Sequence, residues 1–361
     1  MKILHVIESN GGTIEFIFLL GKYTPEIQHH VFSGKRAWDD LNRIKQNDPT
    51  NFPQNVSFSF WKYSQREIHL LKDALALINL IGFISKSKNY SVIHLHSSKA
   101  GFLGRIAAWC LRRKNIIYTT QAISFIRQDI SGLTKKLYIL LEKIGYYLGG
   151  LVICSSESEK EALNVIGIKA ISIPNGTEKI LKFDKFQNNG SITVITSGRI
   201  TAQKNPLLFQ NIAKHYAANP IVKFKWAGDG ELRSMLDSDN IEITGWLSRE
   251  EVRRQVSNGD IYISTALWEG MPYSVLEAMA LSKPLILNNC IGNVDLVDSN
   301  NGFIFNNLEE AISCLNTLLE NEEKRFQMGI SSYSSFLNTY EIKKIVQQFL
   351  SIYYSLKREV A

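Results

Sequence analysis

The chain has 361 residues, 45% of them hydrophobic and 21% charged, which is the composition of an ordinary globular protein. This length exceeds what one hydrophobic core usually supports, so two domains are expected. The longest apolar stretch, residues 74–85, falls short of the roughly 20 residues that cross a bilayer, which excludes a membrane-spanning helix.

The net charge of +7 is distributed unevenly along the chain. Residues 1–174 carry 22 Lys and Arg against 13 Asp and Glu, a net charge of +9, whereas residues 175–361 carry 19 against 21, a net charge of −2. The basic half is expected to face an anionic partner, such as a lipid head group or a phosphate-linked substrate, with nucleic acid as an alternative. A solvated basic surface without a partner explains the excess equally well.

The cysteines and the first residues of the chain indicate in which cellular compartment the protein works. The four cysteines are scattered singly, without the close spacing of a zinc site or a redox pair. The apolar run that precedes Glu8 is too short for a signal peptide. We therefore expect a reduced, cytoplasmic setting.

Short β-branched runs alternate with helix-length amphipathic segments along the whole chain, which predicts parallel sheets in an α/β fold. The first series of predicted strands covers residues 2–8, 29–34, 56–61, 91–97, 115–121, 150–156 and 170–174. The second series covers residues 192–198, 222–228, 241–246, 260–266, 283–289 and 302–306.

These two series predict two doubly wound domains. The N-terminal domain is expected over residues 1–174 and the C-terminal domain over residues 175–340, joined by the turn "PNGT" and a polar stretch that runs to about Ser191. A final helix, residues 341–361, is expected to pack back toward the N-terminal domain. We find no internal repeat or low-complexity tract.

Ligands of such sheets bind outside the carboxyl ends of the strands, so the loops after the strands hold the candidate site. Gly11 and Gly12 follow the first strand, where they permit close approach to a phosphate, although a tight turn explains them equally well. Arg199 and Lys204 lie on one loop after the first strand of the second series, and this pair suits a diphosphate. A surface position explains either cation alone.

The stretch "WEGMPYSVLEAMA", residues 268–280, contains two glutamates eight positions apart. Pro272 predicts that a helix begins between them, with Glu269 on the loop and Glu277 inside the helix. The free N–H groups at the start of this helix can bind an anion or sugar hydroxyls. Gly228 and Gly245 lie in two further turns on the same edge, where they can line a nucleotide pocket or merely connect strands to helices.

At these motifs the sequence resembles the retaining glycosyltransferases of family four, which have the GT-B fold of two facing Rossmann-like domains. The resemblance covers nearly the whole chain. The fairly specific motifs are "GRITAQKNP" and "EGMPYSVLEAMA", and the weaker ones are the Gly-Gly loop, "HLHSSKAG" and "IPNG".

The resemblance implies a role for each matching residue. Glu277 would bind ribose hydroxyls of the donor nucleotide, Glu269 the transferred sugar, and Arg199 and Lys204 the diphosphate, in a cleft between the domains. The catalytic residues would be Glu269, Arg199, Lys204 and Gln121. The further donor-binding residues would be Gly12, Gly198, Gly228, Gly245, Gly270, Met271, Pro272, Tyr273 and Glu277.

One position departs from the family pattern. Family members often have a histidine after the strand that matches residues 115–121, and this chain has Gln121 there. An amide can bind a sugar hydroxyl but cannot carry a proton as imidazole does. A catalytically silent protein that binds nucleotide sugars or partners a transferase therefore stays open as an alternative. A sugar-nucleotide epimerase, which shares the two-domain architecture, is a second alternative.

The leading hypothesis is a metal-independent, hexosyl-type transferase that retains the anomeric configuration. The expected donor is a nucleotide sugar, specifically a UDP-sugar, and the expected acceptor is a lipid-linked surface polysaccharide or O-antigen-type glycan. No cofactor, metal or nucleic-acid partner is expected. The "DSD" at residues 237–239 is interpreted as loop polarity, with metal binding as the alternative.

His96 and Lys99 are the candidates on the acceptor side, and a structural role is expected for His94. Residues 133–148 place lysines beside apolar residues. Such a helix can rest on the anionic inner face of the cell membrane or, alternatively, pack on the sheet of its own domain.

Overall fold

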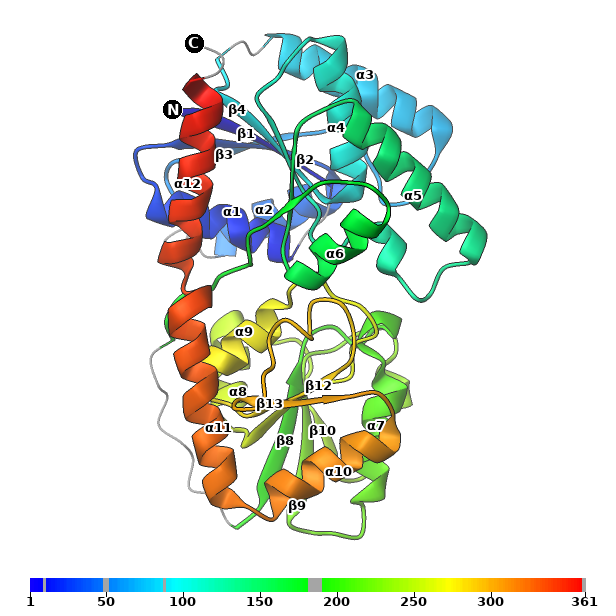
Figure 1. The fold of residues 1–361 in the computed structure, drawn as a ribbon, viewed down its shortest axis with the longest axis vertical. Helices are drawn as coiled ribbons and strands as arrows, with labels where there is room; N and C mark the ends of the chain where they lie inside the picture. Colours follow the sequence, from blue (N-terminus) through cyan, green and yellow to red (C-terminus); the bar gives the residue numbers. More distant parts are fainter. Residues whose placement is uncertain (9–10, 48–51, 87–88, 181–189, 359–361) are drawn as a thin grey trace. The chain divides into compact units, whose positions relative to one another are not determined.

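The structure is a computed structural model that describes residues 1–8, 11–47, 52–86, 89–180 and 190–358. The chain divides into two compact units (Figure 1). The N-terminal unit comprises Met1–Ile126, Ile130–Asn175 and Ile342–Ala361, and the C-terminal unit comprises Arg127–Asp129 and Gly176–Glu341. Most of the polar stretch predicted to join the two domains falls in residues 181–189, outside the described residues.

The N-terminal unit is built on a parallel sheet whose strands lie in the order β3-β2-β1-β4-β5-β6-β7. The strands are β1 (Lys2–Ile7), β2 (Gln28–Ser33), β3 (Val56–Phe60), β4 (Val92–His96), β5 (Ile116–Thr119), β6 (Leu151–Cys154) and β7 (Ile171–Ser172). The helices are α1 (Gly12–Tyr23), α2 (Lys35–Asn47), α3 (Leu70–Lys86), α4 (Ser97–Cys110), α5 (Gly132–Tyr147), α6 (Glu157–Val165) and α12 (Ile342–Arg358), with the short η1 (Ser124–Ile126) before α5.

The two faces of this sheet differ in chemistry, because successive side chains on a strand point to opposite sides. Ile93 and Leu95 of β4 join an apolar core that includes residues of α3 and α4. His94, on the other face, meets the rings of Phe16 from α1 and Phe349 from α12. Helix α12 therefore completes the N-terminal unit, although its residues come last in the chain.

The C-terminal unit has a second parallel sheet in the order β10-β9-β8-β11-β12-β13. Its strands are β8 (Ile192–Ser197), β9 (Val222–Ala227), β10 (Ile241–Ile243), β11 (Ile261–Ser264), β12 (Leu285–Asn288) and β13 (Gly302–Phe305). The helices are α7 (Pro206–His215), α8 (Arg249–Asn258), α9 (Tyr273–Ala280), α10 (Leu308–Leu319) and α11 (Glu322–Ser335), and the short turns are η2 (Ala202–Lys204), η3 (Arg233–Met235) and the π-helical η4 (Phe336–Tyr340).

Helices cover both faces of this second sheet (Figure 1). Val194 belongs to a core shared with α7 and α10, and the next residue, Ile195, belongs to the core shared with α8 and α9. Strands buried on both faces read as continuous apolar runs, which is why "ITVITS" and "LILN" could be recognised in the sequence.

The predicted elements are confirmed. Each predicted strand segment contains a strand, and the final helix begins at Ile342. In each sheet the strand order reverses once, between β1 and β4 and between β8 and β11. Ligands of open α/β sheets bind at the carboxyl edge beside such reversals, and the candidate residues of each unit lie there.

Candidate active site

The loops after β8 and β11 are tied to each other in the C-terminal unit. Leu267 N donates to Gln203 O over 2.8 Å, and Thr265 Oγ1 donates to Lys204 O over 2.7 Å. Gln203 Nε2 donates two hydrogen bonds, to Trp268 O at 2.9 Å and to a carboxylate oxygen of Glu269 at 3.3 Å. The two loops therefore form one rigid platform at the strand-order reversal.

Lys204 and Glu269, predicted separately from two motifs, form an ion pair on this platform. Lys204 Nζ lies 2.7 Å from Glu269 Oε1, and the two side chains are 19% and 10% exposed. Burial lowers the pKa of Lys204, but the adjacent Glu269 carboxylate outweighs burial and the net pKa is raised. Lys204 is therefore a permanent cation beside a mostly buried anion.

Arg199 contrasts with Lys204. It is exposed, and its side chain has no hydrogen bond or ion pair with any residue that the structure describes. Gly198, just before it, has φ of +129°, and Gly198 O accepts from Trp226 Nε1 at 2.9 Å. The backbone is thus fixed while the guanidinium stays open to an incoming anion.

Glycines permit close backbone approach around the platform. A Cβ on Gly228 would lie 2.2 Å from Gly198 O, and φ at Gly228 is +150°, so only glycine fits. Gly270 O lies 2.5 Å from the position of a Cβ on Gly292. Gly245 has φ of +76° in the turn after β10, and a Cβ there would lie 3.8 Å from Asp229 Oδ2, an ordinary contact distance.

The helix predicted to begin between the two glutamates is α9, with Pro272 at its N-cap, so that prediction is confirmed. Met271 and Pro272 are buried, and Tyr273 is half-buried. Glu277 is 7% exposed on the second turn of α9. The two glutamates therefore occupy a loop and a helix, as their spacing indicated.

Two arginines that were not singled out from the sequence contact Glu277. Arg249 Nε and Arg253 Nε donate to Glu277 Oε1 over 2.8 and 3.0 Å. Among the described residues, the buried Arg253 Nη2 has no hydrogen-bond partner. This side chain therefore offers an open N–H next to the predicted ribose-binding carboxylate.

A local signal for these arginines existed. Ser248 and Glu251 form a capping box that fixes the first turn of α8. Arg249 and Arg253 are four residues apart and so share one face of that helix. What the sequence could not give was the direction of this face, which depends on how α8 packs against α9.

In the N-terminal unit, Gly12 begins α1 and Gly11 precedes it with φ of +68°. Thr13 Oγ1 donates to Gln121 Oε1, which links α1 to the loop after β5. Gln121 and Ala122 both have positive φ, 50° and 70°, a strained conformation that surrounding structure must maintain. Gly12 and Gln121 are therefore brought to one edge of this sheet.

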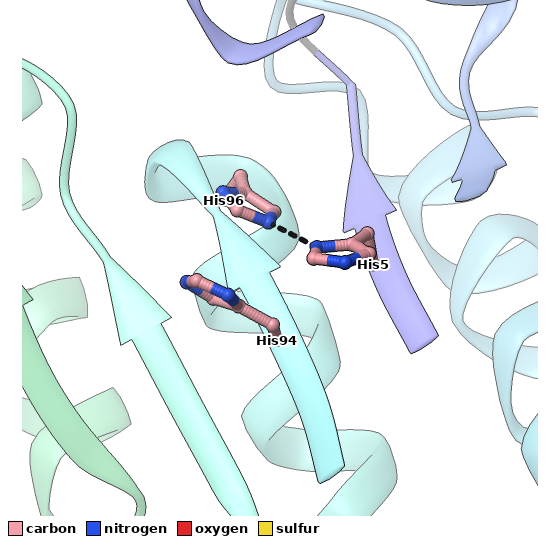
Figure 2. A group of neighbouring side chains, drawn as sticks. All are labelled: His5, His94 and His96. Atoms are coloured by element: carbon pink, nitrogen blue, oxygen red, sulfur yellow. Dashed lines mark hydrogen bonds between the residues drawn. The ribbon is translucent and has the colours of Figure 1, made fainter. Parts of the chain in front are cut away.

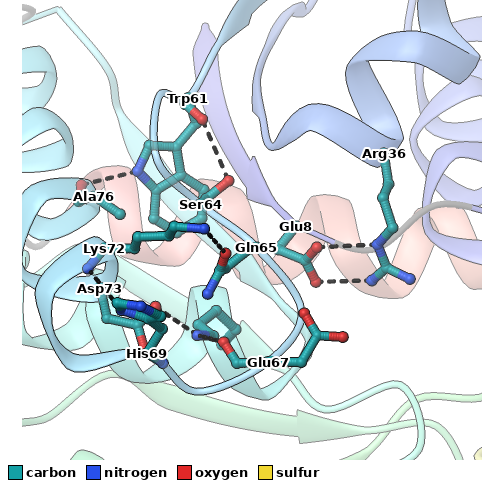
Figure 3. Close-up of polar contacts among 11 residues, drawn as sticks. Glu8, Arg36, Trp61, Ser64, Gln65, Glu67, His69, Lys72, Asp73 and Ala76 are labelled. Atoms are coloured by element: carbon teal, nitrogen blue, oxygen red, sulfur yellow. Dashed lines mark hydrogen bonds and ion pairs between the residues drawn. The ribbon is translucent and has the colours of Figure 1, made fainter.

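The two candidates for the acceptor side have different surroundings. His96 is fully buried at the end of β4. Lys99 Nζ is bound to Asp73 Oδ1, in the first turn of α3, at 2.6 Å, and to Glu67 O, in the loop before α3, at 2.8 Å. Figure 3 shows Glu67 and Asp73. Lys99 thus anchors that loop, while His96 faces the sheet edge shared with Gln121.

Figure 3 also shows a second ion pair near the end of β1. Arg36 Nε and Nη2 donate to Glu8 Oε1 and Oε2 at 3.1 and 2.9 Å. Gly34 lies against Glu8, since a Cβ there would be 3.4 Å from Glu8 Cα and 3.5 Å from Glu8 Cγ. The pair fixes the start of α2.

The interpretation of "DSD" as loop polarity agrees with what surrounds it. The motif follows η3, and Asp237 contacts Lys214 at 3.1 Å and also the side chain of Gln210. These partners serve to connect the loop to α7.

No helix among the described residues is long and apolar enough to cross a membrane. Helix α5 nevertheless has an apolar stripe on its exposed surface. The exposed members of this α5 stripe are Leu133, Leu137, Leu140, Ile144 and Tyr147.

Each of the two units matches a family model of known proteins. Residues 23–179 match the family model described as Glycosyltransferase Family 4, and residues 191–321 match the model described as Glycosyl transferases group 1. Together these ranges contain most of the candidate residues, including Lys204, Glu269 and Glu277.

Curated relatives extend along most of the chain. The UDP-Gal:alpha-D-GlcNAc-diphosphoundecaprenol alpha-1,3-galactosyltransferase of Escherichia coli is 30% identical over 319 residues, covering 80% of this chain and 81% of the relative. The capsular polysaccharide biosynthesis glycosyltransferase CapM of Staphylococcus aureus is 24% identical and covers 82% of this chain and 84% of the relative.

Solved structures show the same fold at low sequence identity. Sucrose-phosphate synthase from Thermosynechococcus elongatus superposes with a TM-score of 0.78 at 17% identity, covering 99% of both chains. Anabaena Alr3699/HepE in complex with UDP superposes with a TM-score of 0.76 at 18% identity, covering 98% of this chain and all of that one.

Proposed function

Because the chain belongs to the family 4 glycosyltransferases and has their GT-B fold, we propose that it transfers a sugar from a UDP-sugar to a lipid-linked glycan of the bacterial surface. The choice of UDP is supported by the E. coli relative, which is named for UDP-Gal, and by the HepE structure, which contains UDP. The choice of acceptor is supported by the diphosphoundecaprenol in the name of the same relative.

The observation that carries the proposal is the Lys204–Glu269 pair beside the exposed Arg199. Lys204 is already held by the Glu269 carboxylate, and Arg199 has no partner among the described residues. Together these side chains suit a diphosphate and the sugar attached to it. Lys204 and Arg199 bind the diphosphate, and Glu269 binds hydroxyls of the transferred sugar. Glu277 binds the ribose, with Arg253 beside it.

The reaction breaks the bond between the anomeric carbon and the β-phosphate oxygen of UDP and forms a bond from that carbon to an acceptor oxygen. Negative charge then develops on the diphosphate, where Arg199, Lys204 and the N-terminus of α9 stabilise it. The acceptor proton passes to the departing phosphate oxygen on the same face of the sugar. The configuration is thereby retained, and two protein cations supply the charge that a metal ion supplies elsewhere.

A calorimetric titration with UDP, GDP and ADP in the presence of EDTA tests the donor site. The wild type should bind UDP in preference to the other two, and Lys204→Met should weaken UDP binding by about ten- to a hundredfold, the range for one lost charge-assisted hydrogen bond. Lys214→Met is the matched control, since Lys214 is exposed and bonded to Asp237.

Either of two results would contradict this part of the proposal. Failure of a folded wild type to bind any nucleotide with EDTA present, while binding appears with added Mg²⁺, would exclude metal independence. Equal loss of binding in Lys204→Met and Lys214→Met would show that the effect is not local to the site.

We further propose that α5 rests on an anionic membrane. Its stripe of Leu133, Leu137, Leu140, Ile144 and Tyr147 repeats at intervals of four and three, so it lies along one face of the helix. These side chains are between 42% and 85% exposed, and the three lysines of the helix are exposed as well. An apolar face with basic neighbours is the pattern of a helix lying in a membrane interface.

The buried side of α5 combines a polar anchor with apolar contacts, which leaves the α5 stripe on the exposed side. Glu142 and Gly145 are the buried residues of this helix, and Glu142 bonds to Arg105 on α4 at 3.0 Å and to Tyr118 on β5 at 2.9 Å. This polar anchor attaches α5 to the unit together with Tyr138, Ile139 and Tyr146, which pack against its core.

Flotation with vesicles tests the membrane contact. The wild type should float with phosphatidylglycerol-containing vesicles at low salt and less with neutral vesicles, and the double variant Leu137→Glu/Leu140→Glu should stay at the bottom. Ile221→Glu, which changes an exposed apolar residue of the C-terminal unit, should float as the wild type does. Absence of flotation at every salt concentration would contradict the proposal.

A further inference from the structure

Four histidines lie buried together on one face of the N-terminal sheet. His5 is on β1, His29 on β2, and His94 and His96 on β4, and none is more than 1% exposed. The rings of His94 and His96 stack with centroids 4.0 Å apart, and the His5 ring lies 5.2 Å from those of His29 and His96. Buried polar groups of this kind need a complete set of hydrogen bonds.

Three of these histidines form a continuous chain of hydrogen bonds that ends at a threonine. His96 Nε2 lies 3.0 Å from His5 Nδ1, and His5 Nε2 lies 2.9 Å from His29 Nδ1 (Figure 2 shows the first of these bonds). His29 Nε2 lies 2.8 Å from Thr24 Oγ1. The Thr24 hydroxyl lies 2.6 Å from Leu20 O, to which it donates.

Burial keeps the three rings neutral. It lowers the pKa of His29 to about 4 and that of His96 to about 3. The pKa of His5 is held well below its usual value, first by burial and then by His29 and His96. A neutral imidazole has one N–H and one bare nitrogen, so each link in the chain has a direction.

Thr24 sets that direction. A carbonyl oxygen cannot donate, so the Thr24 proton lies toward Leu20 O, and Thr24 Oγ1 must accept from His29 Nε2. His29 Nδ1 is then bare and accepts from His5 Nε2. By the same step His5 Nδ1 is bare and accepts from His96 Nε2. The chain therefore leaves His96 Nδ1 without a proton.

This bare nitrogen is the open end of the chain. His96 Nδ1 is buried and has no hydrogen-bond partner among the described residues, and Figure 2 shows the second ring nitrogen of His96 pointing away from His5. His96 pairs in register with Ile7 at the end of β1 and Thr119 at the end of β5. Helix α1, which follows β1, and the loop after β5 are joined by the Thr13–Gln121 hydrogen bond. The nitrogen is thus at the strand-order reversal, where ligands of such sheets bind.

We propose that His96 Nδ1 accepts a hydrogen bond from a hydroxyl group of a bound sugar, and that Thr24, His29 and His5 are positioning residues that keep this nitrogen bare. The ligand in this inference rests on the proposed sugar transfer, whereas the direction of the chain does not. A neutral acceptor selects a proton-bearing hydroxyl over a phosphate oxygen, which has no proton to donate at neutral pH.

A metal site is the competing interpretation of the same cluster. His5, His94 and His96 offer ligand atoms within 4.8 Å of one another. However, His94 Nδ1 is bonded to Tyr353 at 2.8 Å and His94 Nε2 to Thr119 at 2.5 Å. A metal ion would have to replace these bonds and the His5–His96 bond.

The tautomers can be read directly from protein labelled with ¹⁵N-histidine. Long-range ¹H–¹⁵N correlation spectra should show Nε2–H and bare Nδ1 for His5, His29 and His96 in the wild type. A sugar-free UDP titration should leave the His96 Nδ1 resonance in place, and the ligand that supplies the hydroxyl should move it upfield. Separate additions of UDP-sugar and of glycan acceptor distinguish the two sources of that hydroxyl.

Thr24→Val tests the positioning role, because valine has nearly the same shape but cannot accept. Without this acceptor, the tautomer of His29 with its proton on Nδ1 is favoured, because that proton can be donated to His5 Nε2. Every hydrogen bond in the chain then reverses its direction, and His96 carries its proton on Nδ1. The KM for the ligand identified by the titration should rise about tenfold, the effect of one lost hydrogen bond. Thr24→Ser should restore both the tautomers and KM, and His30→Gln, which changes a histidine outside the chain, should not reverse it.

Several outcomes would overturn the inference. They are an Nδ1–H on His96 in the wild type, a His96 resonance that no sugar ligand moves, or stoichiometric Zn²⁺ binding that removes the Nε2–H signals. A wild type with the expected tautomers that transfers no sugar from any nucleotide sugar would refute the proposed function and leave the chain of fixed direction intact.

Discussion

Arg249 and Arg253 both direct their Nε–H groups at Glu277 Oε1. The other oxygen, Oε2, has no hydrogen-bond partner among the residues that the structure describes, so under the proposed function it is the oxygen that accepts from a ribose hydroxyl. A carboxylate held by two guanidinium groups is fixed in direction before a ligand arrives. At the scale of single residues, the two arginines therefore fix the orientation of the Glu277 carboxylate.

We predict that Arg253→Met weakens UDP binding by about tenfold, because Glu277 loses one of its two orienting bonds and the pocket loses the open Nη2. The measurement is a titration calorimetry series with UDP. Arg254→Met, the next residue and half exposed, is the matched control and should bind as the wild type does. Equal affinities for Arg253→Met and the wild type would assign Arg253 no part in nucleotide binding.

At the scale of elements, α5 is attached to α4 through a buried polar group. The side chains of Arg105 and Glu142 are 1% and 5% exposed, and the guanidinium lies 4.3 Å from the centre of the Tyr118 ring. Gly101 and Gly145 permit this approach, since a Cβ on either would lie within 2.4 Å of Tyr118 or Arg105 atoms. Such pairs fix geometry more than they stabilise, because desolvation offsets much of the attraction.

This gives a double-mutant prediction. Glu142→Leu leaves a buried guanidinium without its anion and should lower the free energy of unfolding by about 3–5 kcal/mol. The double variant Arg105→Met/Glu142→Leu removes both charges and should be more stable than Glu142→Leu alone. Urea unfolding of the single and double variants measures this, and strictly additive losses would contradict the coupling.

At the scale of the whole molecule, the buried histidines make stability depend on pH. Burial lowers the pKa of His29 to about 4 and of His96 to about 3, whereas an unfolded chain keeps histidine near 6.5. Between these values the unfolded state binds more protons, so stability is present above pH 6.5 and is lost as the pH falls below it.

We therefore predict that the N-terminal unit loses stability from about pH 6.5 toward pH 4, by up to about 1.4 kcal/mol per pH unit for each such histidine. Amide hydrogen exchange in β1 and β4 at pH 7.5, 6.5 and 5.5, corrected for the intrinsic rate, measures the change. Constant protection across this range would contradict the prediction.

The sequence by itself determined the α/β architecture and the chemistry of the donor motifs. Strands buried on both faces are continuous apolar runs, and Pro272 marks a helix start, because these signals depend on local patterning. Arg199, Lys204 and Glu269 were recognised because loops at the carboxyl edge of parallel strands carry ligand-binding residues, and Glu277 because its motif resembles that of the family. Their roles stay predictions.

Only the tertiary structure decided which of these side chains meet. The Lys204–Glu269 pair joins residues 65 positions apart, and the hydrogen bond from His96 to His5 joins residues 91 positions apart. Strand order and the packing of α8 on α9 create such contacts, and no local pattern encodes them. The outward apolar stripe of α5 was undecided for the same reason, because its direction follows from the contacts of Glu142 with Arg105 and Tyr118 and from the packing of Tyr138, Ile139 and Tyr146 on the core.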